Sequence, residues 1–288
     1  MRPFAQVDVF TDVPGLGNPV AVVLDATGLD TEAMSRFAAW TNLSETTFVL
    51  PPTGAGDYRV RIFTPSTELP FAGHPTLGTC RALLDAGLVT PRDGRIVQEC
   101  DAGEVVLDIG DGTVSFTAPR AEVLPAPGGI ADLPAALGGI AVHDPLLLDV
   151  GPRWLTARVT PDALHDLRPD PVGLPALFAE HGWDLTLYAV DGDEVHVRSL
   201  FDAGGLVEDP VCGSGNVAVA AHLRATGALA ALPRPYLARQ GRHRGRDGRV
   251  VVDASASAIR VGGAAVTVIS GTVAIAGVAA VSGEDWRS

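Results

Sequence analysis

The sequence contains no lysine, because all 21 of its basic residues are arginines. This absence excludes a Schiff-base lysine, and with it pyridoxal phosphate and lysine-aldolase chemistry. It also excludes the phosphate-binding lysine of a P-loop. Any reaction at a carbon–hydrogen bond must therefore proceed without a Schiff base as electron sink.

Cysteine is scarce as well. The spacing of Cys80, Cys100 and Cys212 fits neither a zinc site nor a disulfide framework, so we expect no metal and a reducing, cytoplasmic environment. The N-terminus lacks the basic and then apolar segment of a signal peptide. A net charge of −13 argues against nucleic acid or an anionic membrane as a partner.

Residues 261–283 carry no charge and form a stretch long enough to cross a membrane. The stretch is nevertheless rich in Val, Thr and Gly, and Ser270–Gly271 interrupts it. We therefore interpret it as two core strands joined by a turn.

The arginine-rich segment 239–249 has two interpretations. One is a nucleic-acid patch. The other is a solvated hairpin, which the interspersed glycines and the acidic whole favour.

Two segments 140 residues apart repeat one pattern. Residues 68–73 (ELPFAG) and 208–213 (EDPVCG) both read Glu-x-Pro-x-small-Gly, and a second glycine follows at Gly87 and Gly227. Glycines that flank an apolar run predict a short helix in each copy. The repeat therefore predicts a duplicated fold with two helix N-termini that can hold an anion.

The coarse secondary structure agrees with two similar halves. Residues 119–139, dense in Pro, Ala and Gly, are the expected domain junction. Alternating or apolar runs predict strands, and helical spacing predicts two further helices. The predicted strands are 6–10, 20–24, 46–50, 58–63, 105–109, 113–117, 154–159, 185–190 and 195–201, and the predicted helices are 31–40 and 175–181.

The two copies differ in their acids. Glu45 aligns with Leu185, and Asp209 aligns with Leu69. One special group from each half is the pattern expected when a duplicated protein keeps a single active site. The alternatives are that both are ordinary surface acids, or that Asp209 only caps a helix.

Four separated motifs resemble the phenazine-biosynthesis PhzF-like family. They are 17–23 (GNPVAVV), 42–46 (NLSET) with 73–78 (GHPTLG), 208–215 (EDPVCGSG), and 239–246 (RQGRHRGR), and together they span nearly the whole chain. The resemblance implies an α/β (α+β) fold similar to diaminopimelate epimerase. In that fold two pseudo-symmetric domains each wrap a curved, mostly antiparallel sheet around a central helix.

The resemblance also implies the domain organisation. Residues 1–118 would form the N-terminal domain, completed by strands near 272–288, and residues 130–270 would form the C-terminal domain. The active site would lie in the cleft between them.

The resemblance further implies cofactor-free proton transfer. Glu45 would be the shuttling acid/base, with His74 and Asp209 as its catalytic partners. Gly73, Gly213, Ser214, Asn18 and Cys212 would contact the substrate, a small amino-acid-derived carboxylate. A homodimer and a place in secondary metabolism, of the phenazine or alkylproline type, are further expectations.

Two residues keep open alternatives. His74 also fits a plain capping or packing role. Cys212 departs from the threonine of the phenazine enzymes and matches one of two epimerase cysteines, whose partner position is Ala72 here. It is either a space-filling thiol or a second base, because a helix N-terminus lowers a thiol pKa. An amino-acid racemase using Cys212 and Glu45 is the second functional hypothesis, and a non-catalytic carboxylate-binding protein is the third.

Overall fold

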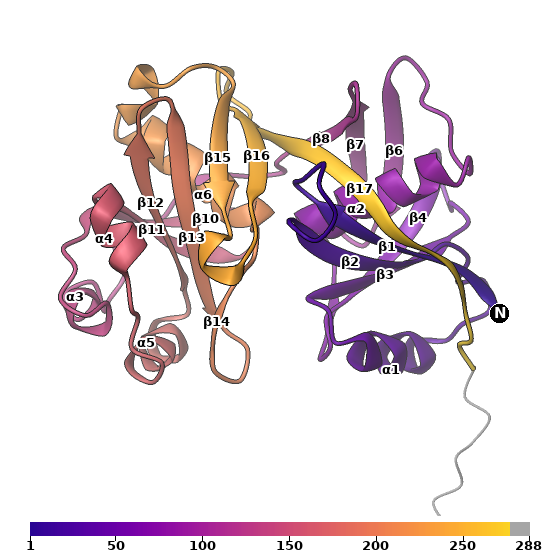
Figure 1. The fold of residues 1–288 in the computed structure, drawn as a ribbon, viewed down its shortest axis with the longest axis horizontal. Helices are drawn as coiled ribbons and strands as arrows, with labels where there is room; N and C mark the ends of the chain where they lie inside the picture. Colours follow the sequence, from indigo (N-terminus) through magenta and orange to yellow (C-terminus); the bar gives the residue numbers. More distant parts are fainter. Residues whose placement is uncertain (277–288) are drawn as a thin grey trace, which may run out of the picture.

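The computed structural model describes residues 1–276, which form two halves side by side, each with a helix inside a curved sheet (Figure 1). The expected α/β fold of this type is confirmed. All strands of the described part join in one hydrogen-bonded network.

Helices and strands follow a similar order in both halves. The helices are α1 (Thr31–Thr41), α2 (Gly73–Asp85), α3 (Leu133–Ala136), α4 (Pro161–Asp166), α5 (Gly173–His181) and α6 (Gly213–Ala225), with short 3₁₀ turns η1 (Ala228–Ala231) and η2 (Arg242–Arg244). The order differs in that the second half has α3 before its first long strand and two helices, α4 and α5, in the place of α1.

The strands of the first half are β1 (Arg2–Val9), β2 (Asn18–Val23), β3 (Glu45–Leu50), β4 (Tyr58–Phe63), β5 (Glu68–Leu69), β6 (Arg95–Cys100), β7 (Gly103–Ile109) and β8 (Thr113–Thr117). Those that follow are β9 (Glu122–Val123), β10 (His143–Asp149), β11 (Arg153–Arg158), β12 (Asp184–Asp191), β13 (Glu194–Asp202), β14 (Leu206–Glu208), β15 (Tyr236–Gln240), β16 (Gly248–Asp253) and β17 (Arg260–Val273).

The strand pairings show the duplication. Strand β3 is parallel to β2 and antiparallel to β4, and β12 is likewise parallel to β11 and antiparallel to β13. Strands β4 and β6 are parallel, as are β13 and β15. Parallel neighbours need a crossover, and α2 and α6 are in those crossovers. Each central helix is therefore surrounded by its own sheet.

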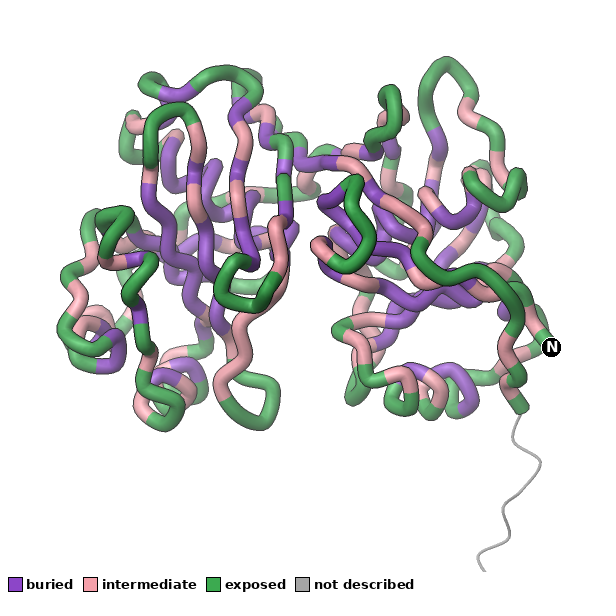
Figure 2. Tube along the Cα trace, in the orientation of Figure 1, coloured by how far each residue is buried: buried purple, intermediate pink, exposed green. Residues whose placement is uncertain are grey.

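The central helices are buried because their sequences are apolar or small on nearly every side. In α6 ten residues are buried, and in α2 nine are. A single hydrophobic cluster extends from Leu77 and Leu83 of α2 to Val217 and Leu223 of α6. Figure 2 shows the buried segments along the strands that surround the two helices. The core thus holds the two helix starts in fixed relation to each other.

Strand β17 differs from the prediction of two strands with a turn. It runs unbroken through Ser270–Gly271, and Gly271 pairs with Phe4 of β1. The predicted turn is wrong because β1 supplies a continuous antiparallel partner, which a local sequence signal does not reveal. Residues 277–283 of the predicted second strand lie outside the described residues.

The course of β17 also changes the domain limits. Residues 260–264 pair with β8 and residues 265–273 pair with β1, so this strand completes the first half. The predicted boundary at residue 270 falls inside β17. The completing strand lies earlier than the predicted 272–288, most of which is outside the described residues. Within residues 1–276, none of the helices has both the length and the apolar character needed to cross a membrane.

Candidate active site

The starts of α2 and α6 meet where the two halves join. A Cβ atom added to Gly213 would lie 3.7 Å from the Cα of Gly73 and 3.8 Å from the backbone nitrogen of His74. These are van der Waals distances, so the two helix starts lie directly against each other. The first N–H groups of each helix have no partner within the helix, so two sets of donors point to one region.

The two helix starts are capped differently. Residue Ala72 precedes α2 and offers no side-chain hydrogen bond, whereas the Cys212 Sγ accepts a hydrogen bond from the Gly215 N–H at 3.2 Å. The first turn of α2 therefore has more donors free for an anionic ligand.

Asp209 reaches this junction from the second half and is held by the first. It follows β14, and its Oδ1 accepts hydrogen bonds from the Asn18 Nδ2 at 2.9 Å and from the Val211 N–H at 3.0 Å. The Asn18 amide, at the start of β2, also donates to the Val211 carbonyl at 3.0 Å. Burial raises the pKa of Asp209 to about 6, although the hydrogen bond that its carboxylate accepts from the Cys212 thiol opposes this rise.

Glu45 lies at the start of β3 with only 16% of its side chain exposed. Burial, and then the negative charge of Asp209, raise the pKa of Glu45 to about 8. Its Oε2 has no hydrogen-bond partner within residues 1–276 and lies 3.4 Å from the Nε2 of His74. The carboxyl is thus neutral in a large fraction of molecules near pH 7.

His74, the second residue of α2, is the neighbour of that carboxyl. Burial lowers its pKa to about 3, and a hydrogen bond to the Pro19 backbone opposes this. The Nδ1 of the ring also lies 3.4 Å from the Asn18 Nδ2, and Nε2 has no hydrogen-bond partner among the described residues. The Nε2 atom faces the Oε2 of Glu45. A single proton on Glu45 fits between these two atoms.

Cys212 and Ser214 complete the junction on the side of α6. The Sγ of Cys212 lies 3.4 Å from the Oγ of Ser214, which accepts a hydrogen bond from the Trp154 indole at 3.1 Å. Burial, and then the charge of Asp209, raise the pKa of the Cys212 thiol well above its usual value. The thiol caps a helix and donates to Asp209, and this geometry does not favour a thiolate base.

All eight predicted site residues lie at this junction, although their catalytic and binding roles remain predictions. Sequence reasoning missed Gln240 and Asn216. The Gln240 Oε1 accepts hydrogen bonds from the Cys212 N–H at 3.1 Å and from the Asn216 Nδ2 at 3.0 Å. The repeat contained a signal for Asn216, because it aligns with Thr76, whose hydroxyl accepts a hydrogen bond from Gln98.

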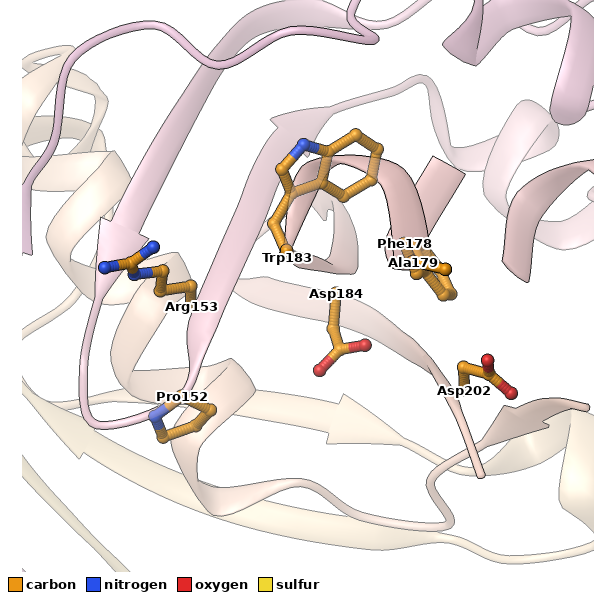
Figure 3. A pocket seen from close by; sticks show the side chains of 8 residues that line it. Pro152, Arg153, Phe178, Ala179, Trp183, Asp184 and Asp202 are labelled. Atoms are coloured by element: carbon orange, nitrogen blue, oxygen red, sulfur yellow. The ribbon is translucent and has the colours of Figure 1, made fainter. Parts of the chain in front are cut away.

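Two depressions on the molecule include none of the eight predicted site residues, although Gln240 lines the second. One, of about 330 Å³, lies beside Trp183, Asp184 and Asp202 (Figure 3). The guanidinium of Arg153 at its rim points away from the two carboxylates. Burial raises the pKa of Asp184 to about 6. Among the described residues, no three His, Cys, Asp or Glu side chains are grouped as metal ligands.

Comparison with known proteins shows the family of this chain. The family model described as phenazine biosynthesis-like protein matches residues 7–271. A trans-2,3-dihydro-3-hydroxyanthranilate isomerase from Pseudomonas fluorescens is 36% identical, with 96% of this chain and 100% of that protein covered. A Schizosaccharomyces pombe protein, antisense-enhancing sequence 1, is 39% identical, with 93% and 97% covered.

Solved structures of the same family have a similar fold. A PhzF-family phenazine biosynthesis protein from Bacillus anthracis superposes with a TM-score of 0.79 at 25% identity, covering 95% of this chain and 99% of that one. A hydroxyproline epimerase from Agrobacterium vitis shares the fold alone, with a TM-score of 0.61 at 17% identity over 94% and 93% of the two chains. The chain belongs to the PhzF (phenazine biosynthesis-like) family of isomerases.

Proposed function

We propose that this protein is a cofactor-independent isomerase that moves a proton within a small, amino-acid-derived carboxylate. The observation that carries the proposal is the meeting of Glu45 and Asp209, from different halves, beside two helix N-termini. The helix starts would hold the substrate carboxylate. A relative at 36% identity is named for trans-2,3-dihydro-3-hydroxyanthranilate, which makes that compound the first substrate to test.

The proton transfer would be carried out by Glu45. As a carboxylate it accepts a proton from one carbon, so that a C–H bond breaks and an O–H bond forms, and it then returns the proton to another carbon. Burial makes this carboxylate a stronger base than one in water, which helps it to act on a weak carbon acid. The lone pair of His74 Nε2 would accept a hydrogen bond from the protonated form and orient it.

Asp209 would remain ionised more readily than Glu45, because Asn18 and Val211 donate hydrogen bonds to it. Two nearby carboxyls whose pKa values differ are suited to different roles, one to carry the proton and one to bind a positively charged or donor group. An amino group on the substrate fits the second role.

Replacement of the proton carrier tests this function. We expect Glu45→Gln to keep the fold and to lose at least about a hundredfold in turnover, because general acid/base catalysis contributes about 10² to 10⁴-fold. Turnover is followed by the absorbance of the conjugated system, and folding by circular dichroism. Turnover of the variant within tenfold of wild type would contradict the proposal.

The same assay distinguishes the proposed isomerase from the racemase of the second hypothesis. Cys212→Ala is the matched variant, and we expect it to keep turnover within about fivefold, because the thiol caps α6 and is not placed as a base. In deuterium oxide a racemase would place label at the α-carbon of both antipodes and would depend on Cys212. Binding of several carboxylates without turnover by wild type would favour the non-catalytic alternative.

We also propose a cytoplasmic homodimer working in secondary metabolism, with a phenazine-type or alkylproline-type pathway as the context. The three cysteines are free thiols, as a reducing compartment would keep them. Light scattering coupled to size exclusion measures the oligomer, and the products of neighbouring genes would identify the pathway.

A further inference from the structure

The glutamates that open the two repeats, Glu68 and Glu208, have no role in the proposed proton transfer. Each forms a two-bonded ion pair with an arginine on the preceding long strand. The Arg198 guanidinium donates to Glu208 at 3.0 and 2.7 Å, and the Arg61 guanidinium donates to Glu68 at 2.6 and 2.7 Å.

The two pairs occupy equivalent places. Glu68 lies opposite Phe63 in the β4–β5 ladder, and Glu208 lies opposite Leu200 in the β13–β14 ladder. Each arginine is two residues before that opposite residue, so it is on the same face of its strand. The two ion pairs are thus structurally equivalent, with one in each half.

The surroundings of the two ion pairs differ, because only the second pair is next to a residue of the candidate active site. The residue after Glu208 is Asp209, whereas the residue after Glu68 is Leu69. Arg198 is 7% exposed and also donates to the carbonyls of Leu164 and Leu167, at 3.2 and 3.0 Å. The second pair is therefore fastened to the loop around α4 and directly adjoins a site acid.

The backbone on both sides of Asp209 is tied to neighbouring segments. The Asp209 N–H donates to the carbonyl of Ser199, the residue after Arg198, at 3.0 Å. The Gln240 Nε2 donates to the Asp209 carbonyl at 3.2 Å. With Glu208 held by Arg198, the peptide that carries Asp209 has little freedom to rotate.

The pair also balances charge. Glu208 is a carboxylate next to Asp209 in the chain, and its charge contributes to raising the pKa of Asp209, after the larger effect of burial. The Arg198 guanidinium, bonded to both oxygens of Glu208, offsets that charge. His243 and His165 line a cleft of about 360 Å³ together with the pair, and Glu45 and Cys212 lie close enough to Asp209 to feel its charge.

We propose that the Arg198–Glu208 ion pair is a positioning element of the active site, which fixes Asp209 and neutralises the carboxylate beside it. This inference rests on the proposed function for the role of Asp209 in turnover, but not for its effect on the ionisation of Asp209. The equivalent pair of the first half serves as an internal control.

The test uses two substitutions with opposite electrostatic effects. Arg198→Met leaves Glu208 without its counter-charge, so the titration midpoint of Asp209 should rise by about 0.5 to 1 pH unit. Glu208→Gln removes the carboxylate and leaves Arg198, so the midpoint should fall by a similar amount. The midpoint is read by NMR from ¹³C-carboxyl-labelled aspartate, with the signal assigned through Asp209→Asn.

Kinetics give the second measurement. We expect Arg198→Met to lower kcat about tenfold and to change KM by no more than about twofold. The reason is that displacement of Asp209 affects the reaction step, whereas the groups that bind the substrate stay in place. Arg61→Met and Glu68→Gln, the matched variants of the first half, should leave the Asp209 midpoint unchanged within about 0.2 pH unit, since neither side chain is among the groups that shift the pKa of Asp209.

A purely structural tie would lower stability in both second-half variants without opposite shifts of the midpoint, and that result would overturn the inference. If Arg198→Met does not fold, Glu208→Gln alone decides, because its amide still accepts a bond from Arg198. The titration is measured in the free protein. A failed Glu45→Gln test would therefore refute the proposed reaction and leave this inference standing.

Discussion

At the scale of single residues, burial decides the chemistry of the site. Glu45, His74 and Asp209 all have pKa values displaced mainly because water is excluded from them. The sequence identified Glu45 and Asp209 from the broken repeat, since each lacks an acidic counterpart in the other half. It did not identify their protonation, because the groups that shield them come from distant segments.

The raised pKa of Glu45 predicts a pH-dependent stability. In the folded protein its carboxyl keeps a proton up to about pH 8, whereas in the unfolded chain it loses the proton near its ordinary pKa of 4.5. The stability that this proton contributes is complete below about pH 4.5 and is lost as the pH rises through about 8. Glu45→Gln cannot titrate, so its Tm relative to wild type should rise between pH 5 and pH 8.5, by roughly 3 °C or more.

Thermal unfolding at the two pH values measures this difference. Glu32→Gln is the matched control, because the Glu32 side chain is 71% exposed on α1 and should give no such trend. An equal Tm difference for Glu45→Gln at both pH values would show that the buried carboxyl does not hold its proton.

At the scale of elements, the sequence predicted a helix correctly where residues at its two ends mark where it begins and stops. The flanking glycines placed α2 and α6, and helical spacing placed the end of α1 to within one residue, just before Asn42, which adopts a left-handed conformation. Strand β6 was missed although its antiparallel partner β7 is the next strand along the chain, and β17 was divided because its partner β1 lies at the other end of the sequence. Which strands pair along the two edges of a given strand depends on the tertiary structure.

Close packing of α2 predicts the effect of a small substitution. A Cβ atom on Gly78 would overlap the side chain of Val20 and lie 2.9 Å from Val9 Cγ2. We expect Gly78→Ala to lower the free energy of unfolding by about 1 to 3 kcal/mol, because overpacking outweighs the helix preference for alanine. The repeat has Ala218 at the equivalent place in α6, where the neighbouring strands leave room.

Urea unfolding measures the change. Gly271→Ala is the control, since an added Cβ there meets nothing within 4 Å, and it should alter stability by less than about 0.5 kcal/mol. A Gly78 variant as stable as the control would show that α2 can move away from β1 and β2.

At the scale of the whole molecule, contacts between the halves complete the site. The Asn18 amide of the first half donates to Asp209 and to the Val211 carbonyl of the second. Arg246 donates to the Gly15 carbonyl, and the Asp247 N–H donates to the Leu16 carbonyl at 2.9 Å, which holds the loop before Asn18. The site therefore exists only in the assembled pair of halves.

Removal of the Asn18 amide tests this dependence. We expect Asn18→Ala to lower kcat about 10- to 100-fold, because a hydrogen bond to a charged group contributes about 1.5 to 3 kcal/mol. Arg246→Ala removes a contact between the halves that does not touch Asp209 and should leave kcat within about twofold. Equal losses in the two variants would instead indicate that the halves have separated.

The sequence by itself determined the exclusion of lysine chemistry, the duplication, the two central helices and the asymmetric acids, because each is a property of residue type or of fixed spacing. Only the tertiary structure decided that Asn18 contacts Asp209, 191 residues away, that the Glu45 carboxyl lies 3.4 Å from the His74 ring, and that Cys212 caps a helix. The physical reason is that a pKa and a hydrogen-bond partner depend on which distant segments exclude water from a group, and the folding of the whole chain sets that arrangement.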